Sequence, residues 1–186
     1  MARENLGVHV RTSHPAFLTL IQEIMERPDV EPHGTGGSGV AHVLLDFPLT
    51  WTLYQLERLD SIDRARTLVV TQATHPAYLD CLASYHVSGV ATSTDERGII
   101  AGLYAAASAQ RSYHYRSPLT FMELRVVRLL LMGYDTQRAA KDLGVSYKTV
   151  NAHVSNALCK LGYENRAQLV VHILGMDPAT TPDDLA

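Results

Sequence analysis

The side chains of this sequence with the clearest chemistry lie on one face of a predicted helix over residues 147–161. Amide, hydroxyl and ammonium groups recur there at helical spacing behind an N-capping serine: Ser146, Lys148, Thr149, Asn151, Ala152, Ser155, Asn156 and Lys160. An asparagine amide can bond bidentately to adenine, small residues allow close approach to a thymine methyl group, and Lys or Thr can hold phosphates. The pattern predicts a surface that reads the major groove of double-stranded DNA.

Four predicted helices must position this surface. A capping box of Thr120 and Glu123 starts the first of them. N-capping residues start the other three helices and glycines end the first three: Asp135, Ser146 and Asn165 at the starts, and Gly133, Gly144 and Gly162 at the ends. A short helix, a glycine-containing turn and a longer helix with a polar face are typical of a helix-turn-helix.

Charge is distributed unevenly along the 186 residues. Residues 1–117 hold nine arginines against twelve acidic residues, whereas residues 118–175 hold seven basic residues against four acidic ones. The three lysines, Lys141, Lys148 and Lys160, all lie in the second segment. Opposite charge suggests two domains, and an anionic partner is expected to meet the second although the formal net charge of the chain is −3.

Strand and helix patterns alternate in the first segment. The runs VHVR, VAHVLLDF, TLVVT and GVA predict strands, and helices are predicted over residues 15–27, 50–59, 75–85 and 96–109. This alternation is typical of right-handed βαβ units around a parallel sheet, whose ligand site lies at the carboxyl ends of the strands. Those ends carry Thr12, Ser13, Asp46, Thr71, Thr92 and Ser93.

These patterns divide the chain into a domain over residues 1–110, a linker over 111–117, an all-helical domain over 118–175 and a tail over 176–186. No secretory signal or membrane-length apolar run is visible, so we expect a cytoplasmic protein without a membrane partner. Residues 34–39 fit G-x-G-x-x-G, but a helix precedes them and a strand follows, the reverse of a dinucleotide site. No catalytic or metal-ligand spacing stands out, so we expect no enzyme, metal or cofactor.

The second domain resembles the LuxR-type helix-turn-helix domain of the NarL/FixJ response regulators. The matching residues are Leu119, Thr120, Glu123, Gly133, Ala140, Leu143–Ser146, Thr149, Val150, His153, Lys160, Leu161, Asn165 and Arg166. The resemblance implies an all-α four-helix domain whose last helix pairs two copies, through Arg166, Leu169, Val170 and Ile173. Asn151 stands where the family usually has a basic, base-reading residue, so a different operator sequence is expected.

The first domain is similar to the receiver domain of the same family, a flavodoxin-like α/β fold, through His14-Pro15, VLLDFP, LVVTQA and SGVATST. The resemblance implies two acidic residues that hold Mg²⁺ with Asp46, a lysine that pairs with the phosphoryl group, and a hydroxyl on Thr71 that moves toward it. Here Thr12 and Ser13 replace the acidic pair and Ser93 the lysine, which makes the phosphorylation site degenerate. The short segment before Asp46 also suggests a trimmed, four-stranded sheet.

The sequence therefore predicts a DNA-binding transcriptional regulator that is independent of phosphorylation and binds two half-sites as a homodimer. RNA polymerase and a small ligand are further candidate partners. Two alternatives stay open: a conventional two-component regulator phosphorylated on Asp46, and a small-ligand-sensing α/β domain fused to a helix-turn-helix. A deep pocket lined by Trp51, Tyr78, Tyr85 or Tyr104 would favour the ligand-sensing alternative.

Overall fold

The computed structural model describes residues 8–12, 15–26 and 41–176, which form two compact units. The first unit contains the described residues up to Gln72 and the segment Tyr85–Tyr115. The second unit contains Ala73–Ser84 and the described residues from Arg116 on. The predicted α/β fold followed by an all-helical fold is confirmed.

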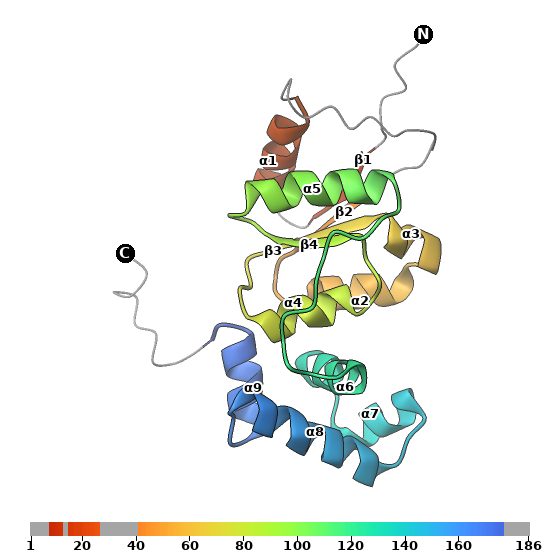
Figure 1. The fold of residues 1–186 in the computed structure, drawn as a ribbon, viewed down its shortest axis with the longest axis vertical. Helices are drawn as coiled ribbons and strands as arrows, with labels where there is room; N and C mark the ends of the chain where they lie inside the picture. Colours follow the sequence, from red (N-terminus) through yellow and green to blue (C-terminus); the bar gives the residue numbers. More distant parts are fainter. Residues whose placement is uncertain (1–7, 13–14, 27–40, 177–186) are drawn as a thin grey trace, which may run out of the picture. The chain divides into compact units, whose positions relative to one another are not determined.

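A four-stranded parallel sheet forms the centre of the first unit (Figure 1). Its strands, β1 (Val8–Arg11), β2 (Ala41–Asp46), β3 (Thr67–Thr71) and β4 (Gly89–Thr92), lie side by side in chain order. Every residue of β2 and β3 is buried, as expected for parallel strands covered on both faces. The sheet agrees with the predicted trimmed, receiver-like architecture.

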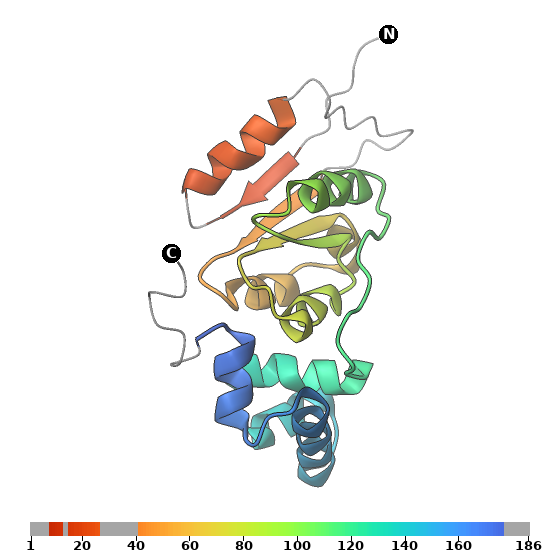
Figure 2. The same ribbon diagram turned by 60° about the vertical axis from the view of Figure 1, so that its left-hand side comes forward.

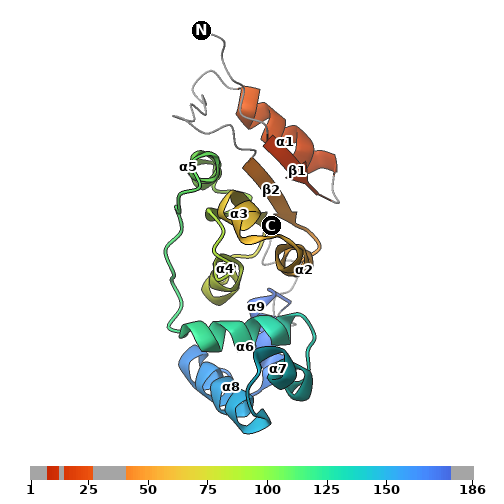
Figure 3. The ribbon, with the colours of Figure 1, turned by 90° about the vertical axis from the view of Figure 1, so that its right-hand side faces the viewer.

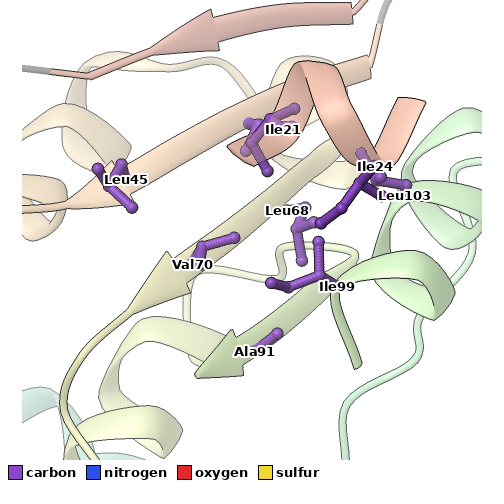
Figure 4. Packing of buried hydrophobic residues seen from close by; sticks show 9 residues of the cluster. Ile21, Ile24, Leu45, Leu68, Val70, Ala91, Ile99 and Leu103 are labelled. Atoms are coloured by element: carbon purple, nitrogen blue, oxygen red, sulfur yellow. The ribbon is translucent and has the colours of Figure 1, made fainter. Parts of the chain in front are cut away.

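Helices cover both faces of this sheet. Helices α1 (Pro15–Glu26) and α5 (Glu96–Ala107) lie on one face, while α2 (Trp51–Arg58) lies on the other (Figure 2). A short helix that the sequence pattern did not predict, α3 (Ser61–Ala65), follows α2. The core between the sheet and its first pair of helices is a cluster of aliphatic side chains (Figure 4): Ile21, Ile24, Val43, Leu45, Leu68, Val70, Ala91, Ile99 and Leu103.

The helices that follow β1 and β2 lie on opposite faces of the sheet. Both connections advance the chain by one strand in the same direction, yet α1 lies on one face and α2 on the other.

The helices of the second unit pack around α6 (Phe121–Leu131), as Figure 3 shows for α7 (Thr136–Leu143), α8 (Tyr147–Leu161) and α9 (Arg166–Ile173). One apolar face of α6 joins a cluster with α7 and α8: Val126, Leu129, Leu130, Ala139, Ala140, Val150 and Val154. The predicted caps are confirmed, including the Thr120–Glu123 capping box and the left-handed C-caps Gly144 and Gly162.

Helix α4 (Pro76–Ala83) belongs to the second unit although it lies between β3 and β4 in the sequence. The thiol of Cys81 donates to the carbonyl oxygen of Leu124 in α6 at 3.6 Å. The fully buried Asp80 carboxylate accepts hydrogen bonds from the backbone N–H groups of Arg116 and Ser117, the latter at 2.6 Å. The sequence predicted this helix but not its packing partner.

Candidate nucleic-acid interface

Helix α8 has one buried and one exposed face. Val150, Val154 and Ala157 point into the helical core, with exposed fractions of 0 to 3%. Five of the predicted DNA-contacting residues are exposed on the opposite side: Lys148, Thr149, Ala152, Ser155 and Asn156. The face that the helical spacing predicted is therefore present, and no side chain in that group is used for the core.

Two hydroxyl groups lie together at the beginning of α8. The side chain of Ser146 accepts a hydrogen bond from the backbone N–H of Thr149 at 3.1 Å, and their hydroxyl oxygens are 2.8 Å apart. The N-terminus of a helix carries partial positive charge and free N–H donors, which favour an anion. Lys148 adds an exposed ammonium group beside this pair, so the end of α8 is suited to a phosphate.

Asn151 lies on the flank of the exposed face and is half-buried. Its Oδ1 accepts a hydrogen bond from Nη2 of Arg166 at 2.6 Å, while Nη1 of Arg166 donates to the hydroxyl of Thr136. One guanidinium thus ties α9 to both α7 and α8. Asn151, predicted to read a base, is therefore hydrogen-bonded within one domain to Arg166, which was predicted to pair two copies.

Lys160 is engaged inside the domain as well. Its ammonium lies 2.7 Å from Oε2 of Glu123, whose exposed fraction is 3% and which also accepts from the N–H of Thr120. Burial alone would raise the pKa of Glu123, but hydrogen bonds from Lys160 and Thr120 together outweigh it and lower that pKa. The charge of Lys160 is therefore directed toward α6.

Three exposed groups near α8 are absent from the predicted set. Tyr147, the first residue of α8, is 53% exposed, and Lys141 of α7 is also exposed. The guanidinium of Arg138 lies 3.8 Å from the ring centre of Tyr134. The exposure of Tyr147 could have been predicted from its position between the N-cap Ser146 and Lys148, because it lies outside the apolar stripe of the helix.

The residues of α9 that were predicted to pair two copies serve mainly the core of their own domain. Leu169 and Ile173 are 0% and 1% exposed, and Val170 packs against the cluster of α6, α7 and α8. Their burial leaves Leu169 and Ile173 no surface for a second chain. The outward side of α9 instead carries Ala167, Val171 and Leu174, which are exposed or half-exposed.

Asp46 and Thr71, from the degenerate phosphorylation site, are neighbours across β2 and β3. The hydroxyl of Thr71 donates to Oδ2 of Asp46 at 3.0 Å, and Oδ1 accepts from the backbone N–H of Thr52 at 3.2 Å. Because Thr50 makes no side-chain capping bond, the 1% exposed Asp46 carboxylate caps the start of α2. Asp46 is thus buried and hydrogen-bonded to both β3 and α2.

The other predicted residues of this site surround the same sheet edge. Thr12 follows β1, and the backbone N–H of Ser93 donates to the carbonyl oxygen of Thr71 at 2.8 Å. Ser13 and the glycine-rich segment 34–39 lie outside the described residues. Within the described ranges, no group of three His, Cys, Asp or Glu side chains could hold a metal ion.

The aromatic residues named for a ligand pocket are divided between the two units. Tyr78 is fully buried in α4, whereas Trp51, Tyr85 and Tyr104 belong to the first unit, where Tyr85 donates to Glu57 at 3.1 Å. The four residues therefore do not all belong to one unit. Among the helices that the structure describes, none is both long and apolar enough to cross a membrane.

Comparison with known proteins assigns the second unit to a family. Residues 117–173 match the model of bacterial regulatory proteins of the luxR family. The spore germination protein GerE of Bacillus subtilis is 39% identical over 67 residues, which are 36% of this chain and 90% of GerE. The response regulator VraR of Staphylococcus aureus is 39% identical over 54 residues, 29% of this chain but only 26% of VraR.

The whole chain also resembles a solved structure of two RcsB dimers bound to two parallel DNAs. The TM-score is 0.51 at 19% sequence identity, and the match covers 94% of this chain and 100% of that one. Fold and sequence together define a regulatory protein with a receiver-like α/β unit and a helix-turn-helix. The chain belongs to the luxR family of bacterial regulatory proteins, and it is a DNA-binding transcriptional regulator of that family.

Proposed function

We propose that this regulator binds specific DNA sequences through the exposed face of α8, without phosphorylation and without catalysis, in the cytoplasm. The observation that carries the proposal is the unburied polar face of α8 behind its N-terminal hydroxyl pair. Ser146, Lys148 and Thr149 hold phosphates at the start of the helix. The base edges face the residues that follow: Asn151, Ala152, Ser155 and Asn156.

We propose a homodimer as the DNA-bound form. A single helix-turn-helix offers a small interface, and two copies on half-sites about one helical turn apart multiply the contacts. The RcsB structure with the same overall fold contains dimers on DNA, which supports this assembly. In α9 the pairing surface then uses the outward residues Ala167, Val171 and Leu174. RNA polymerase and a small ligand are the further partners that such a regulator would meet.

Independence from phosphorylation rests on the surroundings of Asp46. Its carboxylate is buried and already accepts hydrogen bonds from Thr52 and Thr71, so a phosphoryl group would have to displace both. Thr12 offers a hydroxyl in place of a carboxylate, which is a weaker ligand for a hard divalent cation. In this proposal residues 1–110 supply regulation and assembly, and residues 118–175 supply the DNA contacts.

The DNA interface is tested by Lys148→Ala. Loss of one phosphate contact should weaken binding to specific and random DNA alike and reduce the slope of log affinity against log salt by about 1. The matched control is Arg97→Ala, which removes one positive charge from an exposed position of α5. Equal effects of the two substitutions in DNA titrations at several salt concentrations would contradict a contact at α8.

Phosphorylation is tested by incubating the full chain with Mg²⁺ and acetyl phosphate. We expect neither a phosphoryl adduct in the intact mass nor a change of oligomeric state, because Asp46 is committed to α2 and β3. Asp46→Asn serves as the control for adducts on other residues. A stoichiometric adduct that disappears in Asp46→Asn would establish the conventional two-component alternative.

A further inference from the structure

The contact between Arg166 and Asn151 determines which end of the Asn151 amide is free. A guanidinium has only N–H donors, so the atom that faces it must be the carbonyl oxygen of the amide. Oδ1 of Asn151 lies 2.6 Å from Nη2 of Arg166, a short charge-assisted hydrogen bond. The amide orientation therefore follows from the chemistry of its partner.

The position of Arg166 is itself constrained. Its second nitrogen, Nη1, donates to the hydroxyl of Thr136, which is only 5% exposed at the start of α7. The backbone of Arg166 begins α9 directly after the N-cap Asn165. The guanidinium is thus held at both ends, and turning it toward solvent would break two hydrogen bonds.

With one lone pair of Oδ1 held by Arg166, the Asn151 side chain keeps for a base its amino group, which has two donors, and a second lone pair that lies beside the guanidinium charge. Bidentate recognition of adenine needs one donor and one acceptor on the amide, because adenine presents N7 and the N6 amino group. Guanine presents two acceptors, N7 and O6, in the same groove. An amide whose oxygen is already bound to a cation offers its two donors more readily than its remaining lone pair, and it therefore complements guanine better than adenine.

We propose that Arg166 is a positioning residue that makes Asn151 a hydrogen-bond donor, so that the regulator prefers guanine to adenine at the base pair that Asn151 reads. The proposal rests on the proposed DNA-binding function of α8. Reading adenine would bring its N6 amino group, a donor, to the second lone pair of Oδ1 beside the Arg166 cation, or would require Oδ1 to exchange a charge-assisted bond for a neutral one. Arg166 therefore acts on specificity through Asn151, without itself touching a base.

The test measures base preference at each position of a randomised DNA pool bound by the full chain. Wild-type protein should prefer guanine at one position, and Asn151→Ala should remove the preference there. Arg166→Met keeps much of the side-chain volume but frees Oδ1, so preference at that position should move toward adenine by about tenfold. In an Asn151→Ala background, Arg166→Met should cause no further change at that position.

Two more variants separate specificity from folding. Thr136→Val removes the other acceptor of Arg166 but leaves Asn151 paired, so the guanine preference should persist. Asn151→Asp keeps an acceptor for Arg166 but has no donor, so thermal unfolding should stay at or above the wild-type temperature while the guanine preference is lost. It shows whether the preference comes from the donors of Asn151, and Arg166→Ala takes the place of Arg166→Met if the latter fails to fold.

The outcomes distinguish this inference from the function on which it rests. A wild-type chain that binds no DNA overturns the proposed function. DNA binding with an adenine preference at the Asn151-dependent position overturns the role of Arg166 alone. So does a guanine preference that is unchanged in a folded Arg166→Met protein, and so does an Asn151→Ala variant with wild-type preferences at every position.

Discussion

At the scale of single residues, two lysines of α8 have opposite roles. Lys148 is exposed beside the N-terminal hydroxyl pair, whereas Lys160 pairs with the buried carboxylate of Glu123. Glu123 also closes the capping box of α6, so this ion pair joins the end of α8 to the start of α6. Residues of one type on one helix therefore contribute to different properties, one to binding and the other to stability.

Lys160→Ala should lower the free energy of unfolding of the helical unit by about 1–3 kcal/mol, because a buried carboxylate loses its partner. Its effect on DNA affinity under folding conditions should be small. Lys148→Ala should show the reverse pattern. Urea unfolding and DNA titration of both variants provide the measurement, and a Lys160→Ala protein as stable as wild type would contradict the role of the ion pair.

The two cysteines should differ in reactivity. Burial raises the pKa of Cys81 to about 12, against a smaller lowering by Arg128, while Cys159 is exposed on α8. Since the thiolate is the nucleophile, a thiol reagent should modify one cysteine per native chain, and both in denaturant. Cys159→Ser should abolish the native reaction; rapid modification of two thiols in native wild-type protein would contradict the burial of Cys81.

Residue-level patterns predicted the exposed face of α8 because helical periodicity is a local property. The partners of its flanking side chains were not predictable in this way. Glu123 is 37 positions from Lys160 and Asn151 is 15 positions from Arg166, so their contacts depend on how α6 and α9 pack against α8. The sequence pattern of a polar residue on a helix does not distinguish a side chain that faces solvent from one that bonds to a buried partner.

At the scale of elements, the start of α4 is linked to the turn between α8 and α9. Nδ1 of His75 accepts from the backbone N–H of Ala77 as the N-cap, and Nε2 lies 3.0 Å from the hydroxyl of Tyr163. The ring of Tyr163 stacks on that of His172 at 5.2 Å. Burial, and secondarily the charge of His172, lower the pKa of His75, so the neutral imidazole is the form that caps α4.

This arrangement predicts a pH dependence of stability. The unfolded chain binds a proton at His75 near pH 6.5, whereas the folded chain resists protonation, so the free energy of unfolding should fall as pH decreases below about 6.5. It should be pH-independent, for this group, above that value. His75→Asn keeps a capping side chain without the titration and should flatten the curve.

His86 also contributes to the pH dependence of the free energy of unfolding. Burial, with Arg111 and Arg64, also lowers the pKa of His86, so a slope of the same sign should remain in His75→Asn. The double variant with His86→Asn should be flatter still. Unfolding curves recorded between pH 5 and pH 8 would contradict the role of His75 if its replacement left the slope unchanged.

The sequence predicted the extent of α4 but not its partner, for a reason visible in its side chains. Residues 77–83 are all buried, so no polar stripe indicates which side faces which neighbour. Helix α6 is likewise buried on more than one side. Leu124, Val127 and Leu131 are buried on the side opposite its cluster with α7 and α8. Only the three-dimensional packing pairs these two surfaces.

At the scale of the whole molecule, the predicted halves of opposite charge correspond to two folds, but not to two uninterrupted stretches of chain. The second unit includes residues 73–84 from within the α/β segment. GerE is matched over 90% of its length by 67 residues of this chain, which leaves it little room for counterparts of α4 or the sheet. Helix α4 therefore adds a layer to the helix-turn-helix of this regulator.

A fragment over residues 117–176 should show the effect of losing that layer. Without α4, the face of α6 with Leu124, Val127 and Leu131 is open to water and should bind an apolar dye such as ANS. Exposure of these three side chains should also lower the free energy of unfolding by several kcal/mol, with about 1.5–3 kcal/mol for each fully buried one. Full-length protein is the reference, and a dye-free fragment of equal stability would contradict the packing.

The three points at which the chain passes between the units also bear on how the protein is made. Cys81 precedes its partner Leu124 by 43 residues, so a ribosome releases α4 well before α6 exists to cover it. During that interval α4 lacks the helix that packs against it in the folded protein. The helical unit can thus be completed only after α9 (Arg166–Ile173) has emerged, which delays contact with DNA until that point of translation.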